Sequence, residues 1–297
     1  MQMKTKTSMN PVGTGKYTGL LLIMPFIIGF ALFTLYPFCA SLILGMTETS
    51  GSKIRFAGTE TFRAMLSDTG FRKAVGVTLR YTLLLVPLKL TVSLLTALLL
   101  NAEIRFIGIY RTAFYIPSIL GSSLAAVIMW QFLFTSDGLV NQLLGLAGIS
   151  PLSWYGDTHL ALLMIVLLRL WEFGSAMILF LNALRDIPQE YYEAARVDGC
   201  GRVRGFFSIT LPLLRNVIFL NLVLQTIAAM QEFSAPYMIT GGGPVKSTET
   251  VGMLIYDEMF RFGDISMANA VSWGLFMLIT IVVILLFRMT GGMKEET

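Results

Sequence analysis

Long apolar runs without a charged side chain dominate this sequence, and they constrain its fold more than any other feature. Uncharged runs of more than 18 residues recur along the chain. Of the 297 residues, 55% are hydrophobic and only 13% are charged, and the mean hydropathy is +0.71. A soluble domain of this size would need a more polar surface, whereas a membrane helix needs about 20 consecutive apolar residues. The composition therefore predicts a membrane protein built from helices.

The apolar segments predict an all-α, polytopic membrane protein with six transmembrane helices. The first uncharged run is too long for the core of a signal peptide, and no A-x-A-like site closes it, so we expect it to remain as a membrane span. Pro25 and Pro37 are expected to bend this span. The six predicted spans are residues 20–44, 81–100, 113–134, 159–184, 217–239 and 267–287. The expected domains are a cytoplasmic tail at 1–17, a transmembrane domain at 18–290 and a second cytoplasmic tail at 291–297.

Two of the segments between spans have features of their own. Residues 62–75 show apolar side chains at helical spacing, and we expect them to form a helix on the surface. Residues 135–158 contain no Lys or Arg, and we expect Trp154 and Tyr155 within this loop to lie at the membrane interface.

The distribution of basic residues predicts the orientation. An even number of spans places both tails on one side, together with the loop at 187–212. Twelve Lys and Arg fall on that side and seven on the other, with Arg80, Lys89 and Arg169 left out because they lie within or beside spans. Because Lys and Arg are enriched in cytoplasmic loops, we expect the tails and this loop in the cytoplasm.

The loop at 187–212 is the only long polar run in the second half of the chain. Pro188 suits the start of a helix, and Gly199 suits its end, so the sequence predicts a helix of about eleven residues between them. Tyr191, Ala194 and Ala195 fall on one face of this helix, and small alanines beside a tyrosine form a surface that another protein can approach closely. The alternative is an ordinary amphipathic surface helix.

The same loop resembles the EAA loop of ABC-importer permeases. The residues that match its pattern are Glu193, Ala194, Ala195, Asp198, Gly199, Leu211 and Pro212. In that family the loop docks into a cleft of a cytoplasmic ATPase. The resemblance therefore implies the type I ABC-importer permease fold, a bacterial inner-membrane location, and a subunit that itself hydrolyses no ATP. It also implies three protein partners: a second homologous permease, a cytoplasmic ATPase dimer and an external solute-binding protein.

Other segments resemble the carbohydrate-importer branch, which includes maltose-type and glycerol-3-phosphate-type permeases. These are Leu35-Tyr36-Pro37, residues 137–141 and residues 239–250, the last reading ITGGGPVKSTET. The implied substrate is a sugar. The first external loop departs from the branch, since residues 58–61 read GTET and residues 76–78 read GVT. A same-fold importer of a non-sugar solute is the nearer alternative, and a membrane receptor or enzyme is the more distant one.

Charged and aromatic residues in the fourth span are candidates for the substrate path. Arg169 and Glu172 lie three residues apart, so one helix face presents both. Charges at this depth are costly and usually face a bundle interior or a wet cavity. They either line the path or form a structural ion pair between helices. Trp171 beside them either stacks on a sugar face or packs against a neighbouring helix.

The fifth span supplies the other candidates. Asn221, Gln225 and Glu232 are expected on one helical stripe, with Gln231 at its edge. Amides and a carboxylate suit sugar hydroxyls, which need paired donors and acceptors. The alternative is interhelical hydrogen bonding, which is common in membranes. Lys89 in the second span either snorkels to the membrane surface or pairs with Glu172 or Glu232.

The sequence favours transport over catalysis. It contains no G-x-x-x-x-G-K-[ST] phosphate loop and no H-E-x-x-H arrangement. His159 is the single histidine and has no cluster of ligand residues around it, so we expect neither a metal nor a cofactor. Cys39 and Cys200 lie in different environments, and we expect no disulfide between them.

Overall fold

The chain folds into a bundle of helices with one short hairpin. The computed structural model describes residues 18–50, 53–102, 106–121 and 123–290, so the predicted tails at 1–17 and 291–297 lie outside the described residues. The helices are α1 (Thr18–Phe30), α2 (Tyr36–Gly45), α3 (Glu60–Ser67), α4 (Thr69–Leu100), α5 (Ile107–Leu120), α6 (Leu124–Leu133), α7 (Leu139–Leu146), α8 (Thr158–Trp171), α9 (Gly174–Arg185), α10 (Gln189–Val197), α11 (Arg202–Gly205), α12 (Leu211–Leu213), α13 (Arg215–Met230), α14 (Ser234–Ile239), α15 (Val251–Tyr256) and α16 (Ile265–Thr290). The π-helical turns are η1 (Ala31–Leu35), η2 (Phe206–Thr210) and η3 (Asp257–Arg261). The strands β1 (Thr47–Ser50) and β2 (Lys53–Phe56) pair antiparallel.

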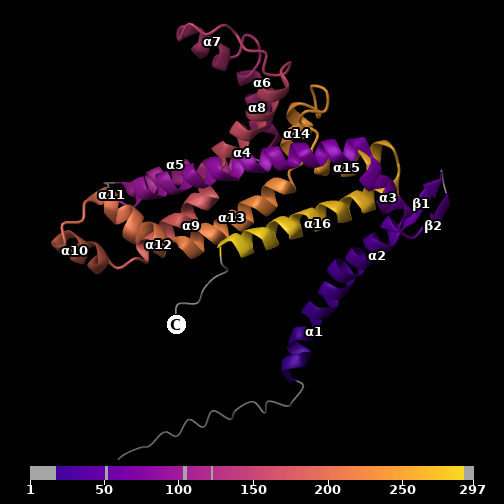
Figure 1. The fold of residues 1–297 in the computed structure, drawn as a ribbon, viewed down its shortest axis with the longest axis horizontal. Coiled ribbons are helices and arrows are strands. Elements are labelled where there is room, and N and C mark those ends of the chain that lie inside the picture. The colour runs from indigo at the N-terminus through magenta and orange to yellow at the C-terminus, as the bar shows by residue number, and fades with distance from the viewer. Residues whose placement is uncertain (1–17, 51–52, 103–105, 122, 291–297) are drawn as a thin grey trace, which may run out of the picture.

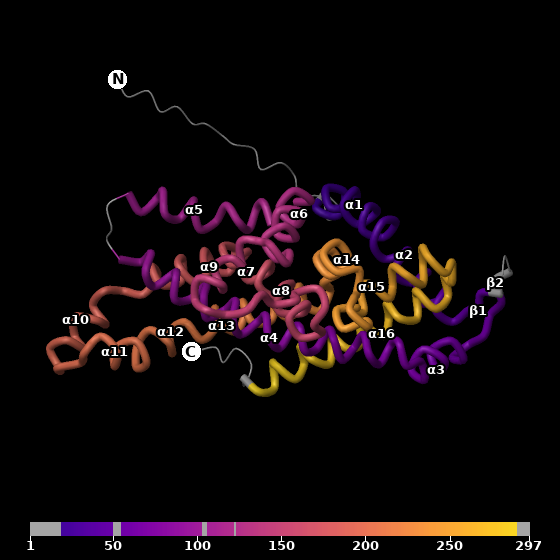
Figure 2. Tube along the Cα trace, turned by 90° about the horizontal axis from the view of Figure 1, so that it is seen from above, coloured from indigo at the N-terminus to yellow at the C-terminus, as the bar shows by residue number. Residues whose placement is uncertain are grey.

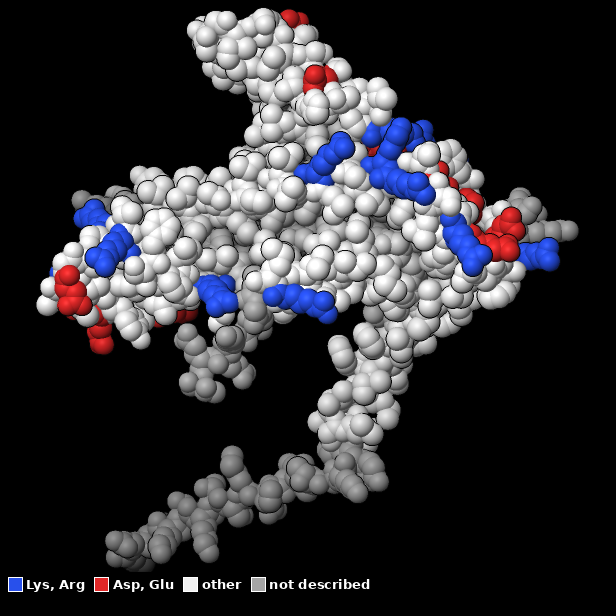
Figure 3. All heavy atoms as spheres, in the orientation of Figure 1, with Lys and Arg blue, Asp and Glu red and all other residues white. Residues whose placement is uncertain are grey.

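The molecule is elongated, and its two ends are built from different parts of the chain. Helices α10 to α12 lie at one end of the long axis, and the hairpin and α3 lie at the other, as both views show (Figures 1 and 2). Helices α4 and α16 run along the axis between them. On the face drawn in Figure 3, charged side chains are sparse along the middle of the body. This distribution suits a protein whose middle lies in a bilayer.

The helical prediction is confirmed, with the small hairpin as an exception. Four helical segments are long and apolar enough to cross a membrane, and up to six are if each bent pair counts as one span. The first span is helical from Thr18 to Gly45, with the π-helical turn η1 in its middle. The second helix begins twelve residues before the predicted 81, because Asp68 caps α4 by accepting a hydrogen bond from the Phe71 N–H at 2.7 Å. The predicted surface helix at 62–75 is therefore split between α3 and the start of α4.

Spans three, four and five are each interrupted, which the apolar pattern alone did not predict. Helices α5 and α6 meet at 96° and α8 and α9 at 45°. In span five, α13 ends at Met230 and α14 begins at Ser234. Ser123 caps α6 by accepting a hydrogen bond from the Ala126 N–H, which compensates part of the backbone bonding lost at the first break. We name these interruptions, between α5 and α6, between α8 and α9 (residues 172–173) and between α13 and α14 (residues 231–233), the three breaks.

Each half of the broken spans has its own apolar cluster. The outer cluster includes Tyr81, Leu85 and Ile165, and it joins α4 to α6, α8, α14 and, through Ala229, the end of α13. The inner cluster includes Met177, Phe180 and residues of α4 and α13. The breaks therefore divide the bundle into outer halves (α6, α8 and α14) and inner halves (α5, α9 and α13).

The loop at 135–158 is more ordered than predicted. It contains α7, and the buried side chain of Asn141 fixes its course. The Asn141 amide donates to the carbonyls of Thr135, Ser136 and Leu152, and its oxygen accepts from the Leu152 N–H and the Trp154 indole. Trp154 is consequently buried against Phe134.

Gly174 permits a close approach between the helices α5 and α9 of spans three and four. A Cβ atom there would lie 2.6 Å from Ser118 Oγ and 2.7 Å from the Phe114 carbonyl oxygen in α5. We expect Gly174→Ala to destabilise the protein by about 1–3 kcal/mol, because helix backbones resist the shift that the methyl group demands. The melting temperature of the detergent-solubilised protein tests this.

Gly76→Ala is the matched control for this variant. Gly76 also lies inside a helix, and nothing lies within 4 Å of its added Cβ atom. We expect an unchanged or slightly higher melting temperature, since alanine favours helix over glycine. Equal melting temperatures for the two variants would contradict the close packing of α5 and α9.

Candidate functional site

The helix predicted in the loop at 187–212 is α10, and its C-terminal stop is confirmed. Gly199 adopts φ +75°, a conformation that favours glycine. The Gly199 N–H donates to the Arg196 carbonyl at 3.0 Å, and the Cys200 N–H donates to the Ala195 carbonyl at 2.8 Å. These bonds form a Schellman motif, which ends the helix sharply. The helix has nine residues rather than about eleven, because Pro188 takes an extended conformation and precedes it.

No described residue of α10 is buried by its own chain. Tyr191 is 54% exposed and Val197 is 89% exposed, so large apolar side chains face outward at this end of the molecule. The Tyr192 hydroxyl lies 2.9 Å from the Thr210 hydroxyl and ties α10 to η2. Glu193 and Ala194 are exposed and Ala195 is partly buried. Exposed apolar side chains on a helix held in place are typical of an interaction surface.

The remaining residues of the EAA-like pattern flank α10 on its C-terminal side. Asp198 is the last residue before the glycine stop and is exposed. Leu211 and Pro212 form the start of α12, directly after η2. A cavity of ≈ 410 Å³ separates α10 from the ends of α4 and α9, and its lining includes Glu193 and the cations Arg185 and Arg196. The loop thus presents a polar cleft behind α10.

A buried ion network is the main polar feature of the helical core. Arg169 Nε and Nη2 lie 2.8 and 2.9 Å from the two carboxylate oxygens of Glu232, and Nη1 lies 2.7 Å from Glu172 Oε1. The three side chains are only 11–13% exposed. We name Arg169, Glu172 and Glu232 the ion triad. The sequence left open whether Arg169 and Glu172 line the substrate path or form a structural ion pair. The contacts support an ion pair between helices, since Arg169 joins span four to span five.

The ion triad lies at the three breaks. Glu172 ends α8, and Glu232 lies beyond the end of α13. A Cβ atom on Gly121, at the break in span three, would collide with the Glu172 side chain. Lys89 of α4 forms no ion pair within 4.0 Å in the described part of the chain, although the Glu172 charge acts on it electrostatically.

The predicted stripe of span five is not continuous. Glu232 leaves it because the helix ends two residues earlier, and Glu232 instead accepts a hydrogen bond from the Ala235 N–H at 3.0 Å. Asn221 is fully buried, with its amide nitrogen 3.5 Å from the Ala176 carbonyl oxygen. Gln225 is partly buried, and Gln231 is exposed. The four residues therefore have different surroundings.

Trp171 packs against another aromatic residue. Its ring stacks on Trp130 at a centroid distance of 6.2 Å and an interplanar angle of 26°. Trp130 also donates from its indole nitrogen to the Met164 carbonyl oxygen at 3.1 Å. The contact favours the packing role for one face of Trp171.

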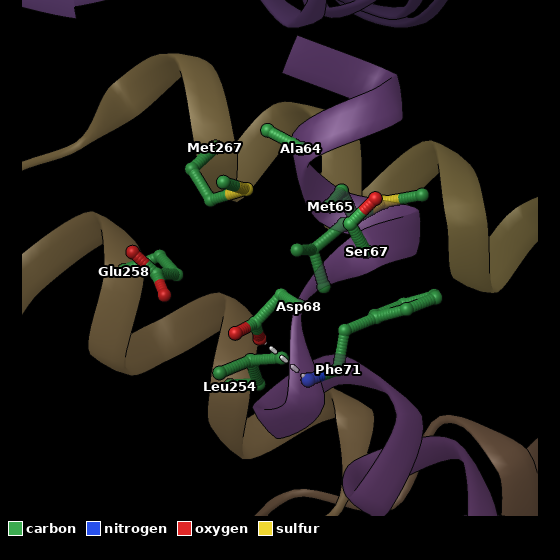
Figure 4. A pocket seen from close by; sticks show the side chains of 9 residues that line it. Ala64, Met65, Ser67, Asp68, Phe71, Leu254, Glu258 and Met267 are labelled. Atoms are coloured by element: carbon green, nitrogen blue, oxygen red, sulfur yellow. Dashed lines mark hydrogen bonds between the residues drawn. The ribbon is translucent and has the colours of Figure 1, made fainter.

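A cavity at the opposite end of the molecule was not predicted from the sequence. Its volume is ≈ 420 Å³, and its lining comes from α3, α4, η3 and their neighbours (Figure 4). Met65 and Phe71 supply apolar walls, while Asp68 and Glu258 add carboxylates. Burial raises the pKa of Glu258, and the charges of Asp264, Asp68 and Asp257 raise it further, with Lys246 acting oppositely. The contributing residues are distant in sequence, so no local pattern signals this cavity.

Comparisons with known proteins extend the argument from α10 to the whole chain. A family model described as binding-protein-dependent transport system inner membrane component matches residues 20–291. The chain is 40% identical over 275 residues to YesP of Bacillus subtilis, a probable ABC transporter permease protein, covering 91% of this chain and 89% of YesP. It is 37% identical over 263 residues to SmoG, the sulfoquinovosyl glycerol transport system permease protein of Agrobacterium fabrum, covering 87% and 85%.

The fold is likewise similar to a solved transporter. A bacterial ABC transporter involved in the import of the acidic polysaccharide alginate matches with a TM-score of 0.78 at 23% identity, covering 93% of this chain and 96% of that chain. The observed architecture is therefore the all-α, type I ABC-importer permease fold. The family match over nearly the full length shows that this chain belongs to the family of binding-protein-dependent transport system inner membrane components.

Proposed function

We propose that this permease moves a carbohydrate across the bacterial inner membrane, driven by a cytoplasmic ATPase dimer that docks on α10. The observation that supports this most directly is the exposed α10 helix with its rigid glycine stop. The carbohydrate is inferred by likeness, since SmoG is named for transport of sulfoquinovosyl glycerol and the structural neighbour for import of alginate. A solute-binding protein on the outer side delivers the substrate, in keeping with the family.

The geometry around α10 suits transmission of force. The helix is tied at one side by Tyr192 to η2, and the loop ends flank the inner cluster through Leu184 and Leu214. A push on α10 therefore displaces α9 and α13 together. ATP-driven closure of the ATPase dimer would then move the inner halves and alternate the bundle between inward-open and outward-open states. In this proposal Glu193, Ala194, Ala195, Asp198 and Gly199 form the docking helix, and Leu211 and Pro212 anchor it.

A second, similar permease completes the pore. Helix α1 has exposed apolar side chains, including Leu22, Phe26 and Ile28, and it diverges from the body (Figure 1). These side chains need a partner subunit or lipid to cover them. The proposed orientation places the α10 end in the cytoplasm, because Arg185, Arg196 and neighbouring cations gather there.

We further propose that the substrate path, between the two permeases, runs past Gln225 in α13 and Gln231 at its C-terminal end. Gln231 is exposed and Gln225 is only partly buried by the chain itself, and amides suit sugar hydroxyls. Trp171 and the ion triad border the same region, where α8 and α13 end. Asn221 serves a different role, as a contact between α13 and α9.

The docking role of α10 is tested by a pair of proline substitutions. Gly199→Pro is expected to abolish transport while the protein still inserts, because proline cannot adopt φ +75° and the helix would lose its end. Gly201→Pro is the control, since Gly201 has φ −73°, which proline accepts. Transport and co-purification of the ATPase are measured for both variants. Normal transport by Gly199→Pro would overturn the docking proposal.

The substrate path is tested by comparing Gln225→Ala with Asn221→Ala. Loss of one hydrogen bond to a neutral sugar is worth roughly 0.5–1.5 kcal/mol, so Gln225→Ala should raise the half-saturation concentration about two- to tenfold with the complex intact. Asn221→Ala should lower the melting temperature without shifting half-saturation, because its amide is buried between helices. Both quantities come from one preparation of the reconstituted importer. An unshifted half-saturation concentration in Gln225→Ala would remove this face from the path.

A further inference from the structure

A displacement of α10 would be transmitted least well across the three breaks. A helix transmits displacement because each turn is bonded to the next, whereas at a break this series of backbone hydrogen bonds is incomplete. Spans three and four are bent by 96° and 45° between their halves, and span five is interrupted at residues 231–233 without a bend of that kind. The contacts across the breaks therefore decide whether the outer halves move together with the inner halves.

Each set of halves is held together by contacts of its own. Among the outer halves, Trp130 of α6 donates to the Met164 carbonyl of α8, and Gln131 of α6 donates to the Met238 carbonyl of α14 at 2.7 Å. Among the inner halves, Gly174 lets α9 approach α5 closely, and Asn221 links α13 to α9. Each set of halves thus has contacts of its own, while α4 packs against both sets and Ala229 of α13 also lies in the outer cluster.

The ion triad connects the breaks with one another. Arg169 lies in the last turn of α8, Glu172 lies at the break of span four, and Glu232 lies at the break of span five. The Glu172 side chain also lies against Gly121 at the break of span three. The continuous helix α4 reaches the same place, because the buried Ser93 hydroxyl donates to the Phe173 carbonyl at 3.1 Å.

Arg169 is not available as a ligand for the substrate in this arrangement. All three of its guanidinium nitrogens are engaged by the two carboxylates, and the contact with Glu232 is bidentate. A bidentate pair fixes angle as well as distance, because two parallel bonds resist rotation. The bidentate contact between Arg169 and Glu232 can therefore fix the angle between α8 and the end of α13.

We propose that Arg169 is a positioning residue of the transport cycle: it holds the three breaks in register, so that displacement of α10 reaches the outer halves as a single movement. This inference rests on the proposed function, because it assigns the ion triad a part in the coupling of ATP hydrolysis to transport. Arg169 acts through Glu172 and Glu232 and does not contact the substrate.

A neutral replacement of the whole triad separates positioning from folding. Arg169→Gln alone leaves two buried carboxylates without their partner, which is strongly destabilising, whereas replacing a complete buried ion network is often neutral. The informative variant is therefore Arg169→Met/Glu172→Gln/Glu232→Gln. Gln at 232 keeps an oxygen for the Ala235 N–H. Arg80→Gln is the matched control, because Arg80 is an exposed arginine of α4 outside the triad.

The measurement is the ATP hydrolysis rate of the complete importer in liposomes, with and without substrate-loaded binding protein. In the neutral triple variant we expect normal assembly and melting temperature, with the stimulation ratio reduced about tenfold, within the range of allosteric couplings. The half-saturation concentration of the binding protein should stay unchanged, since no docking surface is altered. Arg80→Gln should match the unmodified importer.

Two outcomes would overturn the proposal. A normal stimulation ratio in the neutral triple variant would show that the ion triad is not needed to hold the breaks in register. Loss of assembly in that variant would show that the ion triad serves folding instead of coupling. Gly199→Pro in the same assay distinguishes these outcomes from failure of the proposed function. Normal stimulation of ATP hydrolysis in Gly199→Pro would contradict docking on α10, whereas the two outcomes above concern the ion triad alone.

Discussion

Arg169 carries a charge in a region of the chain that water does not reach freely, and the way this charge is neutralised organises the middle of the bundle. A guanidinium among apolar helices needs acceptors for its N–H groups and a compensating charge. Glu172 and Glu232 supply both, at 2.7–2.9 Å. Because both carboxylates lie where helices end, the same contacts that neutralise Arg169 also fix the geometry of the breaks.

This constraint links the two ends of the molecule. The α10 helix protrudes at one end with no buried residue, and the hairpin and the acidic cavity beside α3 lie at the other (Figures 1 and 4). Between them, the inner cluster is contiguous with the loop that contains α10, and the outer cluster surrounds Tyr81 and Ile165. The ion triad lies between these clusters. A movement that begins at α10 reaches the outer end through packed helices and this one polar junction.

The features that sequence reasoning predicts well are the local ones. Apolar length predicts the spans, and the position of Gly199 predicts the end of α10, because both depend on a few adjacent residues. The breaks depend on tertiary contacts instead: the Glu172 side chain occupies the space beside Gly121, and a partner 63 residues away draws Glu232 out of its helical stripe. Helical periodicity assumes an unbroken helix, so it predicts Glu232 on the same stripe as Asn221 and Gln225. The acidic cavity could not be predicted either, since its walls come from segments far apart in sequence.

The most direct test of this account is the distance between an inner and an outer half of one permease during the cycle. Spin labels at Phe132 in α6 and Leu179 in α9, both exposed, report on it after Cys39 and Cys200 are replaced by serine. The account predicts that this distance is the same in the resting importer and in the ATP-bound importer, while the distance from Phe132 to a label in the partner permease changes. A change in the distance between Phe132 and Leu179 with the ion triad intact would contradict it.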